Sequence, residues 1–364
     1  MSVHKYKTKK GDRWYVKYDN ATKRGFLRKT DALRYEAKLK LLEEEPQKFI
    51  MLHDFIDDFL KNGVKNVTYA TSQSKEAIFN NIIKPNFPDK NFFSVTEIDC
   101  RDFRDKVDLL DYSTRYKNVI LSLFKSLFKY ARKYYKLKND PTYVIEPFKS
   151  SFEEKMKQRE KELSRVWQVD EFNQFIKYVN NDTYEAFFIT LFYTGMRLGE
   201  IQALTWKDFK NGEFPIVKSV TRKAQGKSYA IKEPKSTSSI RNIQVGKNLE
   251  MYLNKYKEKQ SKIAGFNEDW FMFGNLKPLA KTTITREKDR AIKEAGVKRI
   301  SIHDFRHSHA SNLIANGINI VAVSKRLGHS SVEMTLRVYT HLIKTTEDQL
   351  LSYIDESSQN LLTK

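Results

Sequence analysis

The segment SIHDFRHSHA, residues 301–310, places three of the chain's seven histidines and an arginine within ten residues. Ser301 and Asp304 have the S-x-x-D spacing of a capping box, which predicts that a helix starts here. His303 and Arg306 are three residues apart and therefore lie on one face of that helix. The segment thus predicts that a permanent cation and a proton-transferring side chain point the same way.

Two more helices are predicted after this segment. In NIVAVSKRLGH (319–329), apolar residues recur at helical spacing and Gly328 ends the helix, so that His329 follows directly after the turn. A second capping box opens SSVEMTLRVYTHL (330–342), and Tyr339 lies on the apolar face of this helix. Periodicity alone would make this tyrosine a core residue.

Earlier in the chain, EAFFITLFYTGMRLGEIQALTW (185–206) predicts an apolar helix that stops at Gly195 and restarts after Arg197. A cation directly after a buried turn has a specific partner, and pairing with Glu200, one helical turn on, is one structural explanation. Trp206 is expected in the core.

The segment SYAIKEPKSTSSIRNIQV (228–245) resembles two strands around a turn at 234–238, which places Lys235 at or near the tip of a hairpin. Taken alone, such a lysine is typical of a solvated surface.

Composition limits the partners. The 364 residues are 40% hydrophobic and include 66 Lys and Arg against 45 Asp and Glu, a net charge of +21. The length predicts two or three domains, and the positive surplus favours nucleic acid first and an anionic membrane second. The longest apolar run, residues 186–193, is far shorter than the ~20 residues of a membrane span. The first ten residues contain no apolar region, so no signal peptide is expected. Cys100 is the only cysteine, which excludes an intramolecular disulfide and a cysteine-based zinc site, so we expect a soluble cytoplasmic protein.

The fold class expected is a multidomain, mainly α protein with small β-sheets, in the segments 1–45, 50–145, 146–162 and 163–364. The first segment alternates basic with apolar residues and predicts a three-stranded sheet on one helix, capped by Thr30. A basic β-ribbon can enter a DNA groove, although a solvated face is the alternative. The second segment has helical periodicity with aromatic residues at core positions. The stretch 139–165, around the third segment, breaks this periodicity with two prolines and dense charge, as in a linker.

Together these motifs resemble the tyrosine recombinases of the phage-integrase type. The resemblance rests on T-G-M-R-L-G-E at 194–200, Lys235, H-D-F-R at 303–306, L-G-H at 327–329 and V-Y-T-H at 338–341, in family order. It extends to the whole chain, because lambda-integrase-like members place an arm-site DNA-binding domain and a helical, SAM-like core-site domain before an α+β catalytic domain. It implies an arm-site domain at 1–45, a core-site domain at 50–145, a linker at 146–162 and a catalytic domain at 163–364.

The resemblance implies a site-specific recombinase that integrates or excises a mobile element through a 3′-phosphotyrosyl intermediate, with no cofactor, metal or ATP. The implied catalytic residues are Arg197, Lys235, His303, Arg306, His329 and Tyr339, the last as nucleophile. The residue types suit this chemistry, since arginine forks match a phosphate that gains charge, and lysine and histidine can move protons. Implied partners are double-stranded DNA with core and arm sites, a homotetramer on that DNA, a host DNA-bending protein and an excision factor, all in a prokaryotic cytoplasm and none in a membrane.

Alternatives remain open at this level. A type IB topoisomerase-like enzyme shares the cleavage chemistry, and a DNA-binding regulator would keep the basic surfaces without any chemistry. His307, His309 and His341 fit helix packing or phosphate contact better than metal binding, because no cysteine or paired carboxylates complete a site. An apolar stripe in the C-terminal tail, which includes Leu351, predicts a short helix that docks either on its own domain or on a neighbouring protomer.

Overall fold

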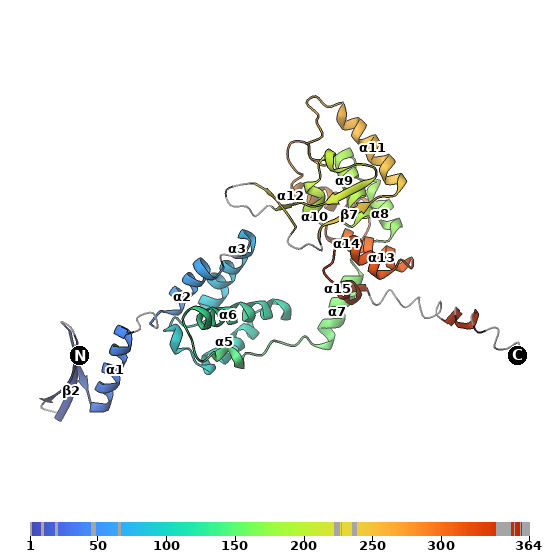
Figure 1. Ribbon diagram of the computed structural model, residues 1–364. Coiled ribbons are helices and arrows are strands. Elements are labelled where there is room, and N and C mark those ends of the chain that lie inside the picture. Colours follow the sequence, from blue (N-terminus) through green and yellow to red (C-terminus); the bar gives the residue numbers. More distant parts are fainter. Residues whose placement is uncertain are drawn as a thin grey trace. The chain divides into compact units, whose positions relative to one another are not determined.

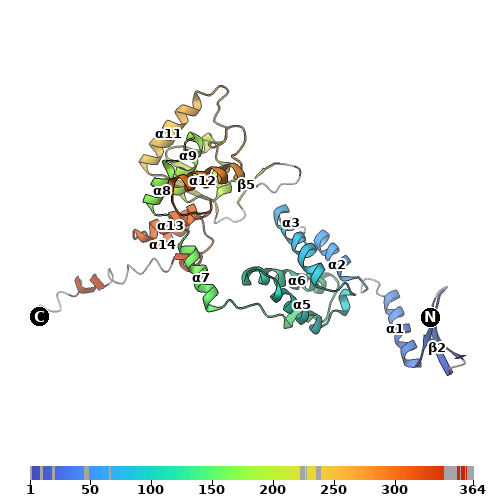
Figure 2. The same cartoon turned by 180° about the vertical axis from the view of Figure 1, so that it is seen from behind.

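The computed structural model divides the chain into two compact units, Met1–Ser151 and Phe152–Lys364 (Figures 1 and 2). The structure describes residues 2–8, 11–18, 21–44, 49–64, 67–221, 226, 228–234, 239–339, 351–352, 354–356 and 358. Within these ranges no helix has the length and apolar composition needed to cross a bilayer.

The first unit begins with an antiparallel sheet in the order β1-β2-β3, which confirms the predicted three strands (Figure 1). The strands are β1 (Ser2–Thr8), β2 (Gly11–Tyr18) and β3 (Ala21–Phe26), and helix α1 (Lys29–Glu44) packs on them. The helix starts earlier than expected, because the carbonyl of Arg28 already accepts from Asp31 and Ala32, so Thr30 lies inside the first turn. Val16 and Ala32 are fully buried between sheet and helix.

The rest of the first unit is helical, as the periodicity predicted. Its elements are α2 (Leu52–Asp58), η2 (Phe59–Gly63), α3 (Tyr69–Ile78), η3 (Phe79–Ile83), α4 (Lys84–Asn86), η4 (Phe92–Ser94), α5 (Glu97–Leu109), α6 (Thr114–Tyr134) and η5 (Pro141–Val144). The aromatic residues form its core: Phe55 stacks on Phe92 with ring centroids 3.8 Å apart, and Phe124 lies against Phe103 at 4.5 Å. Burial of these rings stabilises the bundle through both apolar area and ring geometry.

The second unit is mainly helical with two small sheets. Its helices are α7 (Phe152–Leu163), α8 (Val169–Ile176), α9 (Asp182–Thr194), α10 (Leu198–Ala203), η6 (Trp206–Asp208), α11 (Lys247–Ser261), α12 (Lys281–Ala295), α13 (Asp304–Ala315), α14 (Ile320–Leu327) and α15 (Val332–Tyr339). Helix α7 occupies most of the segment interpreted as a linker, because its dense charge includes Glu153 and Glu154 at the helix start, where the dipole favours acids.

The two sheets correct one expectation. Strand β4 (Glu213–Ile216) pairs with β7 (Arg241–Gln244), and β5 (Ser219–Thr221) pairs with β6 (Ala230–Lys232). The strands on either side of Lys235 therefore pair with earlier strands, and the hairpin predicted between them was wrong. The reason is long-range packing, since Phe214 faces Ile243 across β4 and β7 and both are buried.

The core of the second unit places the site residues. Phe305 is fully buried at the start of α13, where it stacks on Phe188 of α9 with ring centroids 5.5 Å apart. The ring of Trp167 lies edge-on to that of Phe305, with centroids 5.3 Å apart. Arg306 follows Phe305 directly, so this packing fixes the backbone position from which the Arg306 side chain extends. Trp206 is buried, as predicted.

Candidate active site

The turn between α9 and α10 brings Arg197 into the site. Gly195 ends α9 with φ +65°, a conformation that favours glycine, and an added Cβ would lie 2.6 Å from the ring of His309. Arg197 directly precedes α10, and its backbone N–H donates to Oε2 of Glu200 at 2.8 Å while its Nη1 donates to Oε1 at 2.8 Å. The pairing with Glu200 left open by the sequence is therefore present, and it orients a guanidinium that is still 37% exposed.

Arg306 enters from α13, whose first turn differs slightly from the prediction. The Oδ2 atom of Asp304 accepts from the backbone N–H of Ser301 at 2.7 Å, and Asp304 N–H donates to the Ser301 carbonyl at 3.0 Å. These bonds close a turn ahead of the helix, so α13 begins at Asp304 rather than at Ser301, and His303 directly precedes it. Arg306 lies in the first turn of α13 and is only 3% exposed.

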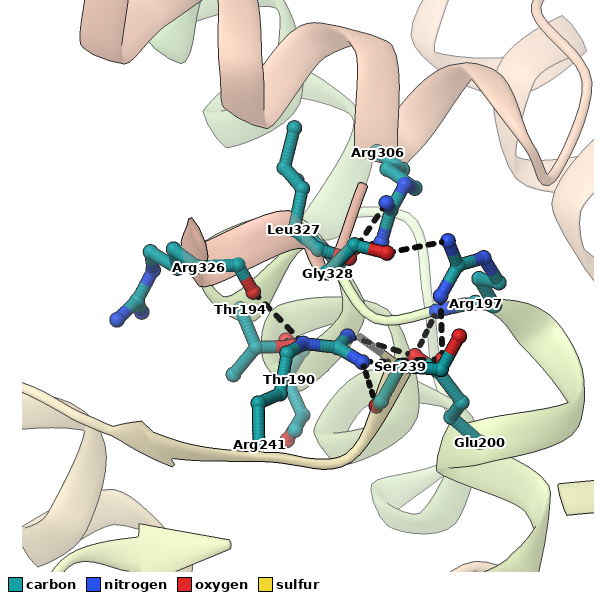
Figure 3. A network of polar contacts seen from close by, with 11 residues as sticks. Thr190, Thr194, Arg197, Glu200, Ser239, Arg241, Arg306, Arg326, Leu327 and Gly328 are labelled. Atoms are coloured by element: carbon teal, nitrogen blue, oxygen red, sulfur yellow. Dashed lines mark hydrogen bonds and ion pairs between the residues drawn. The ribbon is translucent and has the colours of Figure 1, made fainter. Parts of the chain in front are cut away.

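The C-terminal turn of α14 joins the arginines (Figure 3). Gly328 ends this helix with φ +68°, as predicted, and the carbonyls before it have no further helical partners. Arg306 donates through Nη2 to the Leu327 carbonyl at 2.6 Å and through Nη1 to the Gly195 carbonyl at 2.9 Å. Arg197 donates through Nη2 to the Gly328 carbonyl at 3.0 Å. Two segments more than a hundred residues apart are thereby held on one turn.

A third arginine completes this turn. Arg241 of β7 donates through Nε to the Arg326 carbonyl at 2.8 Å and forms a two-pronged contact with Glu200, at 3.1 Å and 2.8 Å (Figure 3). Burial on its own would raise the pKa of Glu200, but hydrogen bonds and charge from Arg241, and hydrogen bonds from Arg197, bring it below its ordinary value. Glu200 is therefore an ionised, buried carboxylate shared by two arginines.

Sequence reasoning missed Arg241. A usable signal was present in the strand period, because Arg241 and the buried Ile243 are two residues apart and so share a face of β7. An arginine on the inward face of a strand needs a buried acid or carbonyl partner.

The side chain of Arg326 links the same turn to neighbouring segments. Its Nη1 donates to the carbonyl of Gln244 at 2.9 Å and its Nη2 to that of Tyr193 at 3.2 Å, while Nε donates to Nε2 of His309 at 3.1 Å. Burial, followed by the charge of Arg326, lowers the pKa of His309 to about 3, so this histidine is neutral. Its role is packing, one of the two explanations that the sequence left open.

His329 and His303 lie beside the arginines. His329 is half-buried, and its Nδ1 is 2.8 Å from the hydroxyl of Thr335, a fully buried residue of α15. Burial, followed by the nearby charges of Arg306 and Arg197, lowers the pKa of His329 to about 4. Partial desolvation and the charge of Arg306 also lower the pKa of His303, whose ring meets that of His307 edge-on at 4.8 Å. Both imidazoles are therefore neutral near pH 7 in the free protein.

The remaining predicted site residues are placed less fully. Tyr339 is the last residue of α15 and lies one helical turn after Thr335 along that helix. Lys235 and His341 lie outside the described residues.

A pocket of about 610 Å³ is lined in part by His303. Four cationic residues, Arg165, Lys281, Lys288 and Arg299, and two acidic residues, Asp289 and Asp304, also line it. Asp289 pairs with both Lys288 and Arg299, so part of the positive charge is already neutralised.

Comparisons with known proteins show the family of the chain. Residues 165–346, half of the chain, match the model of the phage integrase family. The chain is 28% identical over 342 residues to the ICEBs1 integrase of Bacillus subtilis (strain 168), covering 90% of this chain and 89% of that protein. It is 25% identical to the integrase of Staphylococcus phage L54a, covering 87% of this chain and 96% of that one.

Solved structures show the same fold. The integrase of transposon Tn1549, in complex with a circular intermediate DNA, superposes with a TM-score of 0.62 at 18% identity, over 78% of this chain and 93% of that chain. A lambda integrase tetramer bound to a Holliday junction gives a TM-score of 0.56 at 15% identity, over 90% and 95%.

The protein therefore belongs to the phage integrase family of tyrosine recombinases. It is an enzyme of site-specific recombination that integrates or excises a mobile element. The mainly α fold with small sheets and the enzyme class expected from the sequence are confirmed.

Proposed function

We propose that the hydroxyl of Tyr339 attacks a DNA phosphodiester in a site built by Arg197, Arg306, His303, His329 and Lys235. One observation carries this proposal: Arg197 and Arg306 donate to adjacent carbonyls, those of Gly328 and Leu327, immediately before His329. Two guanidinium groups and an imidazole are thus gathered on one turn. The helix that follows ends at Tyr339.

The arginines would act by electrostatic preorganisation. Negative charge builds up on the non-bridging oxygens when a fifth oxygen approaches phosphorus, and donors already in place stabilise that charge without reorganising. A guanidinium is always charged and presents a planar fork that matches phosphate. Bonds to Glu200 and to carbonyls fix the orientation of these forks before DNA arrives.

The histidines would supply hydrogen bonds and proton transfer. When Nδ1 of His329 accepts from the Thr335 hydroxyl, its Nε2 carries the proton and can donate to the phosphate. A neutral His303 is able to accept a proton, as assistance to a nucleophilic hydroxyl requires. A free tyrosine hydroxyl has a pKa of ~10 and needs such help near pH 7.

The covalent step balances without an added reagent. A bond forms between the Tyr339 oxygen and phosphorus, the bond from phosphorus to the 5′ oxygen breaks, and the 5′ oxygen takes a proton, for which we propose Lys235 as donor. The 3′-phosphotyrosyl link retains the phosphodiester energy. Attack by a 5′ hydroxyl reverses the step, so neither ATP nor a metal ion is required.

The other segments would organise the DNA. We assign residues 1–45 to arm sites, 50–145 to core sites and 163–364 to catalysis, with a linker at 146–162. Support comes from the basic three-stranded sheet and the separate helical bundle, and from the tetramer that lambda integrase forms on a Holliday junction. A homotetramer on core and arm sites, assisted by a host DNA-bending protein and an excision factor in a prokaryotic cytoplasm, completes the proposal.

The test is capture of the covalent adduct. The protein is incubated with nicked duplex fragments of host and element DNA, adducts are separated on a denaturing gel, and the attached DNA is sequenced. Tyr339→Phe should abolish the adduct and leave DNA affinity nearly unchanged, because it removes one oxygen and little contact area. Tyr193→Phe, at an exposed tyrosine of α9, is the matched control and should retain adduct formation. Adduct in Tyr339→Phe would place the nucleophile elsewhere.

The C-terminal tail gives a test of assembly. Leu351 and Ile354 are about half exposed, which suits a stripe that docks on a neighbouring protomer. Removing residues 345–364 should leave the melting temperature and DNA binding intact and abolish synaptic complexes on native gels. A truncated protein that unfolds, or that still forms synaptic complexes, would show that the tail does not act in trans.

A further inference from the structure

We propose that Arg241 is a positioning residue for DNA cleavage, which holds both Arg197 and the turn at 326–329 in place. The inference rests on the proposed function, because it concerns the same site. Arg241 lies on β7, outside the set of residues assigned to the chemistry, and its side chain is 7% exposed against 37% for Arg197. Its Nε, Nη1 and Nη2 atoms all donate to protein groups, namely the carbonyls of Arg326 and Ser239 and the carboxylate of Glu200, so its effect must pass through these groups.

The first route runs through Glu200 (Figure 3). Each oxygen of this carboxylate accepts one bond from each arginine: Oε1 from Nη1 of Arg197 and Nη1 of Arg241, and Oε2 from the Arg197 backbone and Nη2 of Arg241. The carboxylate plane is thus set jointly by two guanidinium groups. Without Arg241, Glu200 could rotate toward Arg197 and pull the exposed guanidinium away from its set direction.

The second route runs through the end of α14. Three consecutive carbonyls, of Arg326, Leu327 and Gly328, accept from Arg241, Arg306 and Arg197 in that order. A helix C-terminus carries partial negative charge, and three cations there both satisfy its carbonyls and complement the dipole. Arg241 is itself a residue of β7, so its bond to the Arg326 carbonyl ties this turn to a sheet, and a bond from its Nη1 to the Ser239 carbonyl at 3.0 Å further fixes its guanidinium.

A pH readout separates positioning from mere stability. Among the residues that the structure describes, the charged groups that face Glu200 are Arg197, from the turn before α10, and Arg241, from β7. Neighbouring β5 contributes the uncharged Ser219–Thr221, and α9 contributes Thr190 and Thr194 (Figure 3). Loss of Arg241 removes the cation that contributes most to keeping this buried carboxylate ionised. Glu200 should then take up a proton at a higher pH and release Arg197.

The experiment measures single-turnover adduct formation from pH 5 to pH 9, on the duplex recovered by adduct capture. Arg241→Met should cleave about 10- to 100-fold more slowly at pH 7, a range typical for residues that orient others, and the acid limb of its profile should move to higher pH. Arg241→Lys keeps the charge without the two-pronged geometry, so its rate should fall between the two. Glu200→Gln cannot titrate, so adding Arg241→Met to it should cause no shift of the acid limb, and the further loss of rate measures the route through the Arg326 carbonyl.

The matched control is Arg290→Met. Arg290 also contacts two carboxylates, of Glu287 and Glu294, and one carbonyl, of Tyr178, but it lies on α12 away from this turn. It should leave the rate and pH profile unchanged, and melting curves establish that each variant is folded. If the wild type forms adduct, two results for Arg241→Met would overturn the inference. One is a cleavage rate equal to that of the wild type, and the other is a rate reduced equally at every pH, with no shift of the acid limb. Absence of adduct in the wild type would instead overturn the proposed function.

Discussion

The cations of the N-terminal sheet and those of the second unit, Phe152–Lys364, have opposite surroundings. Lys5, Lys7, Lys23 and Arg24 are exposed on the strands, and the Lys5 ion pair with Asp12 is itself about half exposed. Arg241 and Arg306 are buried, and named carbonyls or carboxylates fix each guanidinium. Exposed cations act mainly by their number and are screened by salt, whereas fixed ones act by geometry. The two regions should therefore respond to different perturbations.

The largest effect is expected from a change of geometry at constant charge. Arg306→Lys or Arg197→Lys should slow adduct formation by about 10²-fold or more, because one ammonium cannot reproduce a fork that is held by two carbonyls or by a carboxylate. DNA affinity should stay close to wild type. Single-turnover cleavage and filter binding on the same duplex measure the two quantities, and near-normal cleavage in both variants would mean that these arginines are structural.

An intermediate effect is expected from removing charge at the sheet. Deletion of residues 1–45 should leave cleavage of a core site intact but cripple recombination between full-length sites. The slope of log affinity against log salt on full-length sites should become shallower by about 0.9 for each phosphate that the protein no longer neutralises. Arg306→Lys should leave this slope unchanged, which provides the control. Equal recombination and equal slopes with and without the segment would make the sheet a solvated appendage.

The smallest effect is on stability and pH. The folded pKa values of His309, about 3, and His329, about 4, lie below the ~6.5 of an unfolded histidine. The unfolded chain therefore binds more protons in this window, so their contribution to stability is complete above pH ~6.5 and is lost as the pH falls toward 4 and then 3. The melting temperature should drop by a few degrees between pH 7 and pH 5. His329→Asn should reduce the steepness of this drop, and an identical pH slope in wild type and variant would contradict the assignment.

The sequence predicted the local parts of this molecule well. The ends of α9 and α14 at Gly195 and Gly328 follow from glycine at the end of an apolar period, and the aromatic core of the helical bundle follows from spacing alone. The buried face of α15 could not be predicted from apolar spacing, because Thr335 is fully buried while Leu336 is 38% exposed. A hydroxyl that bonds to His329 has no apolar signal.

The parts that escaped prediction depend on contacts between distant segments. Arg241 is 41 residues from Glu200 and 85 from Arg326 along the chain, so no local period connects them. The strand partners around Lys235 were misassigned for the same reason: pairing was decided by apolar side chains of β4 and β5, which precede the segment. Helix α13 begins at Asp304 rather than at the predicted Ser301, because a hydrogen bond between these two residues closes a turn directly ahead of the helix in the chain.

The turn at the end of α14 also has a consequence for how a newly made chain gains its cutting activity. Its carbonyls at 326–328 are the acceptors for arginines that were synthesised as much as 131 residues earlier. Until that turn has emerged and folded, the earlier arginines lack these partners and are not held in their final directions. A chain that ends before residue 326 therefore lacks the acceptors that hold these arginines, and under the proposed mechanism it also lacks His329 and Tyr339, so we expect it not to cleave DNA.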